Sequence, residues 1–190
     1  MSFKTSAACT LALVVMCGAI VALQPLRASA DTSAAHDGQH DFDFHLGTWK
    51  SDISKLQHPL TGSTTWIACQ GKIVARKIWD GRAQMEELEA DCPAGHMEDM
   101  LVFLYNPDTH QWSLNAAAVG DGVIGKPMFG EFKNGLGEFY DQETYKGRTI
   151  LVRQVWSDIT PTSHHFEQAF SDDGGKTWEP NFRATLTRMQ

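Results

Sequence analysis

The chain has 190 residues, with 16 lysine and arginine side chains against 23 aspartate and glutamate side chains, a formal charge of −7 at pH 7. This acidic balance argues against nucleic acid or an anionic membrane surface as the partner. The length suits one domain with a substantial core, but it is too short for a multi-bladed propeller.

The first thirty residues have the layout of a secretory signal. Lys4 lies in a short polar start, an apolar run extends from Ala7 to Leu23, and Ala28-Ser29-Ala30 ends the segment. Signal peptidase recognises this pattern, and the small and polar residues after the run favour cleavage over a retained anchor. We therefore interpret residues 1–30 as a signal peptide, and we expect an exported periplasmic or secreted protein without membrane insertion after cleavage.

The cysteine count supports the same compartment. Two of the four cysteines lie in the predicted signal, which leaves Cys69 and Cys92 as a pair. In an oxidising compartment such a pair predicts a disulfide. A metal site at Cys92 and His96 would need two further ligands that the sequence does not show nearby, so no metal and no cofactor are expected.

The remaining chain divides into a short leader and one folded unit. Residues 31–39 are small and polar and predict a flexible leader, and residues 40–190 form the predicted domain. Segments rich in β-branched and aromatic residues alternate with turn residues about every ten positions. The predicted strands are 47–56, 63–69, 73–80, 82–90, 97–106, 111–119, 128–132, 137–145, 148–157, 163–171 and 177–188.

Turn chemistry indicates how these strands connect. Asn134-Gly135 and Lys146-Gly147 supply the left-handed backbone positions that tight hairpins need. Successive hairpins give an antiparallel meander, and so many strands in one domain must hide their edges. The predicted fold is all-β, a single antiparallel up-and-down barrel of about ten strands.

The segment Phe42-Asp43-Phe44-His45-Leu46-Gly47-Thr48-Trp49 precedes the first strand. The spacing of its apolar residues predicts a short helical turn that plugs one end of the barrel. The pattern F-D-F-x-x-G-x-W resembles the opening of a family of bacterial lipocalin-like domains of unknown function, within the wider calycin group. That resemblance implies a ligand-binding barrel and a structural pair between Trp49 and an arginine of the last strand, Arg183 or Arg188.

A second motif lies near the C-terminus. Residues 171–178 read S-D-D-G-G-K-T-W and satisfy the Asp-box pattern S-x-D-x-G-x-T-W of sialidase propellers. Only one copy is present, and a propeller needs several. We therefore interpret the motif as a structural hairpin clip in which Asp173 accepts turn amides and Trp178 packs back on the hairpin.

The hairpin across Lys146-Gly147 allows the two faces of its strands to be sorted, because a two-residue loop sets the cross-strand pairs. Its more apolar face is predicted to lie inside the barrel. That face carries four candidate ligand-binding residues, which are Asp141, Glu143, Gln154 and Trp156.

Two outcomes are open for the acidic residues of this hairpin. If Asp141 and Glu143 point into an apolar cavity, they either orient a ligand or serve as acid and base, because burial can drive the pKa values of neighbouring carboxyl groups apart. If the register slips by one residue, both acids face water and Tyr140 with Arg153 lines the interior.

On strand 163–171 the aromatic residues alternate with His165, Glu167 and Ala169, so the face that carries His164 and Gln168 is predicted to point inward. His164 and Gln168 thereby join the ligand-binding candidates. His164 is also a candidate catalytic base or haem ligand, although a lone histidine is more often a structural hydrogen-bonding residue.

Three functions are compatible with these patterns. The favoured one is a binding protein that holds a small hydrophobic or aromatic molecule in the barrel cavity. The second is a small lyase, isomerase or hydrolase in which Asp141, Glu143 or His164 transfers a proton without a cofactor. The third is a structural or interaction protein of the cell envelope, with the barrel filled by side chains.

Overall fold

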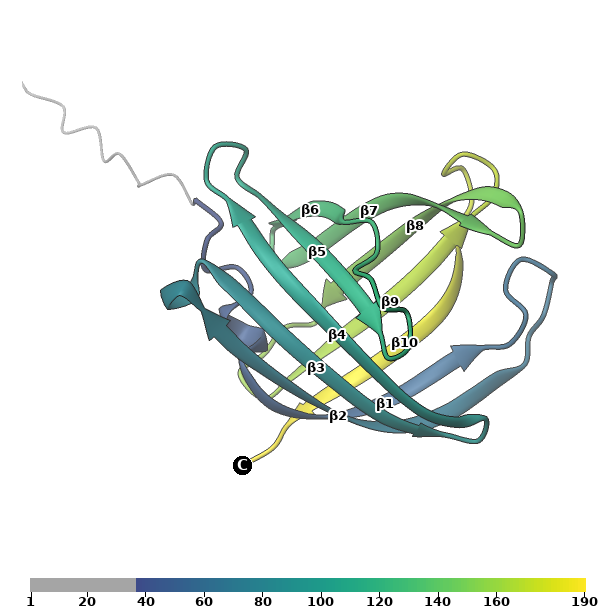
Figure 1. Cartoon of the computed structure of the whole chain (residues 1–190), viewed down its shortest axis with the longest axis horizontal. Helices are drawn as coiled ribbons and strands as arrows, with labels where there is room; N and C mark the ends of the chain where they lie inside the picture. The colour runs from purple at the N-terminus through teal and green to yellow at the C-terminus, as the bar shows by residue number, and fades with distance from the viewer. Residues whose placement is uncertain (1–36) are drawn as a thin grey trace, which may run out of the picture. The chain divides into compact units, whose positions relative to one another are not determined.

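The computed structural model describes residues 37–190, so the predicted signal peptide and residues 31–36 of the predicted leader lie outside the described residues. Within this range, ten strands run obliquely around one closed barrel (Figure 1). Each strand pairs antiparallel with its sequence neighbours and β10 pairs with β1, which confirms the predicted up-and-down barrel. The strands are β1 (Gly47–Leu56), β2 (Trp66–Ile78), β3 (Ala83–Cys92), β4 (Gly95–Asn106), β5 (Gln111–Ala118), β6 (Met128–Lys133), β7 (Leu136–Tyr145), β8 (Arg148–Ser157), β9 (Ser163–Ser171) and β10 (Glu179–Arg188).

One predicted turn is part of a strand. The sequence predicted separate strands at 63–69 and 73–80, whereas β2 runs without a break from Trp66 to Ile78. Gly71 lies opposite Ser51 and Ala90 in this ladder, and a Cβ atom there would meet the carbonyl oxygen of Glu89 at 3.0 Å. The glycine thus permits a close approach of two strands rather than a reversal of the chain.

Successive hairpins lie at alternate ends of the barrel, so each end carries its own set of connecting segments. Residues 37–46, which include the 3-10 turn η1 (Asp43–His45), lie at the end where β1 begins, together with the second 3-10 turn, η2 (Trp79–Gly81). The 57–65 and 119–127 loops lie at the opposite end, where β1 and β5 finish. We call these the η1 end and the loop end. None of the helices within residues 37–190 is long and apolar enough to cross a membrane.

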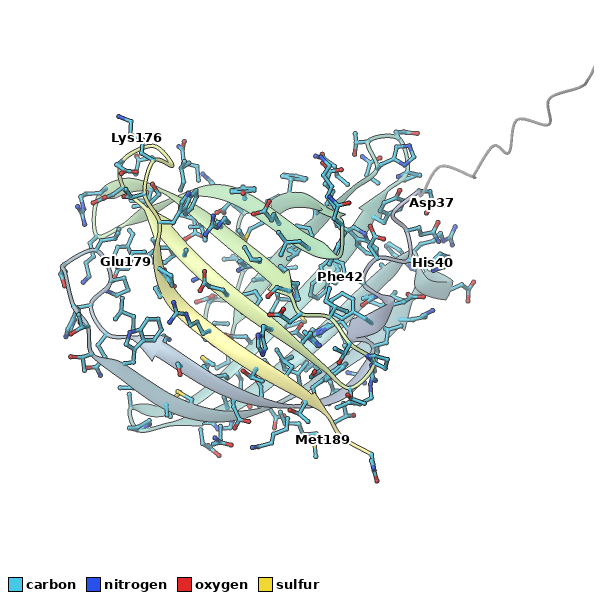
Figure 2. All side chains as sticks on the ribbon, turned by 180° about the vertical axis from the view of Figure 1, so that it is seen from behind. Asp37, His40, Phe42, Lys176, Glu179 and Met189 are labelled. Atoms are coloured by element: carbon cyan, nitrogen blue, oxygen red, sulfur yellow. A yellow bond between two sulfur atoms is a disulfide. The ribbon has the colours of Figure 1, made fainter. Side chains whose placement is uncertain are left out.

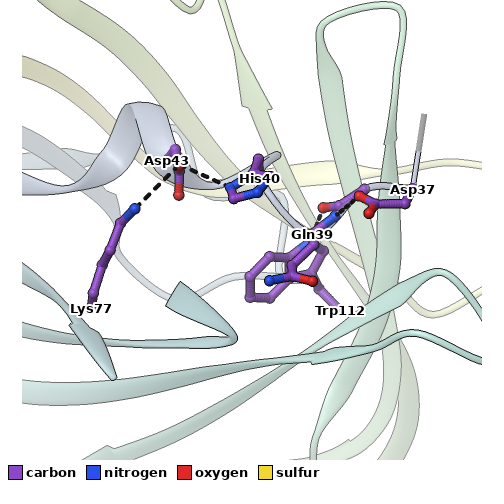
Figure 3. A network of polar contacts seen from close by, with 7 residues as sticks. Asp37, Gln39, His40, Asp43, Lys77 and Trp112 are labelled. Carbon is purple, nitrogen blue, oxygen red and sulfur yellow. Dashed lines mark hydrogen bonds and ion pairs between the residues drawn. The ribbon is translucent and has the colours of Figure 1, made fainter. Parts of the chain in front are cut away.

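Residues 37–39, the last of the predicted leader, lie against the barrel at the η1 end (Figure 3). The indole Nε1 of Trp112 donates to the Gly38 carbonyl at 2.9 Å. Asp43 of η1 is contacted by Nδ1 of His40 at 3.1 Å and by the ammonium group of Lys77 at 3.4 Å. These contacts fasten the entry of the chain to β2 and β5.

The predicted disulfide between Cys69 and Cys92 is present, with an S–S distance of 2.03 Å. It joins β2 to β3 at the loop end and closes a loop with a sequence separation of 23 residues. Cys69 is buried in a core cluster with Trp49, Ile73 and Leu186. The bridge therefore restrains two strands that also form part of the cavity wall described below.

The Asp-box residues form a hydrogen-bonded hairpin between β9 and β10. Asp173 accepts bonds from the backbone amides of Lys176 and Thr177, each at 3.0 Å, and from the Ser171 hydroxyl at 2.8 Å. These bonds, led by those from Thr177, hold the pKa of the Asp173 carboxyl well below its ordinary value. The guanidinium carbon of Arg153 lies over Trp178, 4.8 Å from the centroid of the indole ring.

Arg188, at the end of β10, covers Trp49 at the η1 end. Its guanidinium carbon lies 4.1 Å from the Trp49 ring centroid. Its three nitrogens donate to the carbonyls of Leu46 and Pro161, both at 2.7 Å, and of Phe44 at 2.8 Å. The planar guanidinium group thereby ties η1 to β10 and to the β8–β9 turn.

Replacing Arg188 with lysine is expected to lower the free energy of unfolding by about 1–2 kcal/mol, because an ammonium group cannot form this planar set of bonds. Urea unfolding followed by circular dichroism measures the change. Arg183→Lys on the same strand is the control, since Arg183 is exposed, pairs with Glu167 at 3.0 Å and lies over the Trp66 ring at 5.0 Å, but its side chain makes no hydrogen bond to a backbone carbonyl within residues 37–190. An equal loss in both variants would contradict the role given to Arg188.

Candidate functional site: a cavity inside the barrel

The barrel encloses a cavity of about 500 Å³. Pro59 of the 57–65 loop and Asp121 of the 119–127 loop line it, so the cavity extends toward the loop end. Much of the wall is apolar, and it includes the aromatic side chains of Trp156, Phe166, Phe170 and Phe182. A space of this size and character suits a small organic molecule, for which pockets of roughly 300–1,000 Å³ are typical.

Three amide side chains form a hydrogen-bonded row on one wall. Nε2 of Gln154 on β8 donates to Oε1 of Gln168 on β9 at 2.9 Å, and Nε2 of Gln168 donates to Oδ1 of Asn181 on β10 at 3.1 Å. We call these residues the amide row. Gln154 and Gln168 lie directly opposite each other in the ladder, whereas Asn181 lies in a β-bulge between Pro180 and Phe182. The bulge lets Asn181 and Phe182, although consecutive, both line the cavity.

The two ends of the amide row have unused hydrogen-bonding atoms. Within the described residues, Oε1 of Gln154 and Nδ2 of Asn181 are buried and have no hydrogen-bond partner. Reversing all three amides would move the free acceptor to one end and the free donor to the other, so one of each remains in either orientation. A buried polar atom without a partner costs about 1–3 kcal/mol, so the row is prepared to bind a polar group.

A second polar group lies where the cavity meets the η1 end. Nε2 of His45 contacts Oε2 of Glu86 on β3 at 2.7 Å, and Nδ1 of His45 contacts Nε2 of His164 on β9 at 3.0 Å. All three side chains are buried. Glu86 and His45 line the cavity, while His164 lies behind them. We call this set the Glu86 relay.

The protonation of the relay follows from its surroundings. Burial, together with His45 and Arg188, lowers the pKa of His164 to about 3, so this imidazole is neutral near pH 7. A neutral His164 carries one N–H, and Nδ1 has no partner among the described residues. Nε2 of His45 donates to Oε2 of Glu86, and one hydrogen bond joins Nδ1 of His45 to Nε2 of His164.

Charged side chains complete the cavity wall. Glu86, Asp99 and Asp121 carry carboxyl groups, and Lys55 of β1 carries an ammonium group. Burial raises the pKa of Asp99, Lys55 offsets part of this effect, and Glu86 and Asp121 add to it. Three carboxyl groups, one ammonium group and the imidazole of His45 are thus the ionisable groups of this wall.

The structure places the predicted inward face of the β7–β8 hairpin inside the barrel. Phe139, Ile150 and Trp156 are buried, whereas Tyr140, on the other face, is 43% exposed. Three of the predicted ligand-binding residues, Gln154, Trp156 and Gln168, line the cavity. These three candidates are thus brought together.

The other sequence candidates lie elsewhere. Glu143 is exposed and Asp141 is half-buried, and neither lines the cavity. β6 pairs with β7 only as far as Tyr140, so the last part of β7 lies at the rim. Burial and the nearby Glu143 raise the pKa of Asp141 to about 7. His164 reaches the cavity only through His45.

Sequence reasoning missed several residues of the cavity. Glu86 shares a strand face with Gln84, Leu88 and Ala90, and this alternation was a signal that Glu86 points inward. His45 lies inside the opening motif but was not singled out. Asn181 could not be found from alternation because the bulge breaks it.

No protein-family model matches the chain, and no curated protein matches it in sequence. Among solved structures, it is similar to an S-type phycobiliprotein lyase from Guillardia theta, with a TM-score of 0.53 and 14% sequence identity over 80% of this chain and 92% of that one. This likeness concerns the fold, a closed antiparallel barrel. A redesigned β-barrel also matches, with a TM-score of 0.43 and 12% identity over 80% of this chain and 96% of that one. The narrower lipocalin-like family suggested by the opening motif stays a prediction.

Proposed function

We propose that this protein is an exported binding protein that holds a small hydrophobic or aromatic molecule inside its barrel. The observation that carries the proposal is the cavity of about 500 Å³, with largely apolar walls and buried polar atoms that have no hydrogen-bond partner among residues 37–190. Apolar walls supply affinity and a few polar groups supply orientation in such sites. The predicted signal peptide and the disulfide support export.

Native mass spectrometry of protein purified from its own compartment is the first test of this proposal. A bound compound that is released on denaturation supports the proposal and identifies the chemical class of the ligand. Two results together would count against a ligand-binding cavity. The purified protein would have the mass of the polypeptide alone, and this mass would not increase when mixtures of apolar and aromatic molecules are added.

The dye N-phenyl-naphthylamine, which is neutral at pH 7, offers a test with a chosen probe. Its fluorescence is expected to rise on binding, and Ala116→Trp should weaken binding at least about tenfold, because Ala116 lines the cavity and an indole would occupy it. Thr187→Trp places the same indole at an exposed position of β10 and should leave binding unchanged. Equal binding by both variants would mean that the dye binds outside the barrel.

A second candidate function is acid-base catalysis in the same cavity, and the Glu86 relay favours it. A carboxylate held by a histidine that contacts a second, neutral histidine can accept a proton from a bound molecule. Incubating the copurified compound with the wild-type protein and with Glu86→Gln distinguishes the two functions. Conversion by the wild type alone indicates an enzyme, and an unchanged compound indicates a binding protein.

A further inference from the structure

The ionisable groups of the cavity suggest what kind of ligand it takes. Three carboxyl groups, one ammonium group and the imidazole of His45 line it, so acidic groups are in excess. Glu86 lies opposite Leu101 on β4, and Asp99 is two residues from Leu101, so the two acids are diagonal neighbours on one sheet face. Such diagonal neighbours lie about 7–8 Å apart, with their Cβ atoms somewhat closer, so one ammonium group can lie between their carboxyl groups.

The Glu86 carboxylate is preorganised. It is 6% exposed, and its Oε2 is fixed by His45 at 2.7 Å. His45 is itself held by His164, and the stacked ring of Trp49 lies 6.3 Å from its centroid. A charged group with such support needs little reorganisation to receive a ligand, so its contribution to binding is retained.

An independent observation points to a ligand in this cavity. Ser51 on β1 is 1% exposed, lines the cavity, and its hydroxyl has no hydrogen-bond partner within residues 37–190. Asn181 lines the same cavity and is 4% exposed, and its Nδ2, at one end of the amide row, also has no hydrogen-bond partner among the described residues. Both are neutral polar groups that can form hydrogen bonds with a ligand whose positive charge is balanced by Glu86 and Asp99.

We propose that the ligand joins an apolar or aromatic body to a protonated amine, with the ammonium group beside Glu86 and Asp99. This inference rests on the proposed binding function and specifies the class of molecule. The body lies against Trp156, Phe166 and Phe170, whose rings also attract cations. An organic anion of the same size is disfavoured, because it would bring a negative charge beside the carboxyl groups of Glu86 and Asp99.

Three probes with one body test the charge preference in the wild-type protein. Naphthylmethylamine, naphthylmethanol and naphthoic acid carry a cationic, a neutral and an anionic head group at pH 7. Isothermal titration calorimetry should show the amine binding about 10- to 100-fold more tightly than the alcohol, and the acid binding most weakly. Equal or tighter binding of the alcohol overturns the inference and leaves the proposed function standing. No binding of any probe overturns both.

A pair of variants assigns the preference to Glu86. Glu86→Gln keeps an acceptor for His45 but removes the charge, so the amine should lose about tenfold or more in affinity while the alcohol changes little. Glu87→Gln is the matched control, because Glu87 is exposed and forms an ion pair with Arg76 on the outer face. An unchanged amine preference in Glu86→Gln would overturn the role of Glu86. Should this variant not fold, the three wild-type titrations still decide the inference.

Discussion

Replacing Phe42 with alanine is expected to lower the free energy of unfolding by about 3–5 kcal/mol. Phe42 is fully buried at the η1 end, opposite the hairpin tip marked by Lys176 (Figure 2). Its ring centroid lies between 4.7 and 5.5 Å from those of five aromatic side chains, which are Phe103, Trp112, Phe132, Phe139 and Trp156. Truncation removes these contacts and leaves a space that the surrounding closed sheet cannot collapse to fill.

Chemical unfolding monitored by tryptophan fluorescence measures this loss. Phe129→Ala is the matched control, because Phe129 is 53% exposed and the same truncation there should cost less than about 1 kcal/mol. Phe42→Leu should fall between the two, since it restores part of the volume. A loss for Phe42→Ala no larger than that for Phe129→Ala would show that the opening segment does not stabilise the barrel.

The architecture was predictable from local patterns because a meander is built from neighbouring hairpins. Two-residue turns such as Asn134-Gly135 and Lys146-Gly147 set strand direction and register without information from the rest of the chain. Closure then follows from the number of strands with unpaired edges. Gly71 misled the prediction, because a glycine that permits close strand approach and a glycine that turns the chain look alike in sequence.

The candidate site was predictable where local pattern determined it, from one hairpin for Gln154 and Trp156 and from the alternation of one strand for Gln168. Gln154 and Trp156 were assigned to the interior because the Lys146-Gly147 turn fixes their register. The Glu86 relay depends on barrel closure, since His45 is 41 residues from Glu86 and 119 from His164. Asp141 and Glu143 were expected in the cavity, but β6 stops pairing with β7 at Tyr140. The alternation of apolar and polar residues does not show where that pairing stops.

Acidification from pH 7 to pH 4 is expected to lower the free energy of unfolding by about 2–3 kcal/mol through His164 alone. The pKa of His164 is about 3 in the folded protein, against an ordinary value of 6.5. Between these values the unfolded chain binds a proton that the folded protein does not, so stability rises with pH across this window and is lost as pH falls below 6.5. The physical cause is burial of the imidazole beside His45 and Arg188.

Urea unfolding at a series of pH values, compared between variants, isolates this contribution. His164→Gln can still donate a hydrogen bond to His45 but does not titrate, so its stability should depend less steeply on pH between 4 and 6.5 than that of the wild type. His165→Gln removes an exposed histidine from the outer face of the same strand and should keep the wild-type slope. Identical slopes in all three proteins would mean that His164 binds its proton in the folded state. Below pH 6.5 the Glu86 relay would then hold an additional positive charge next to the cavity, and the preference for a cationic ligand would weaken in that range.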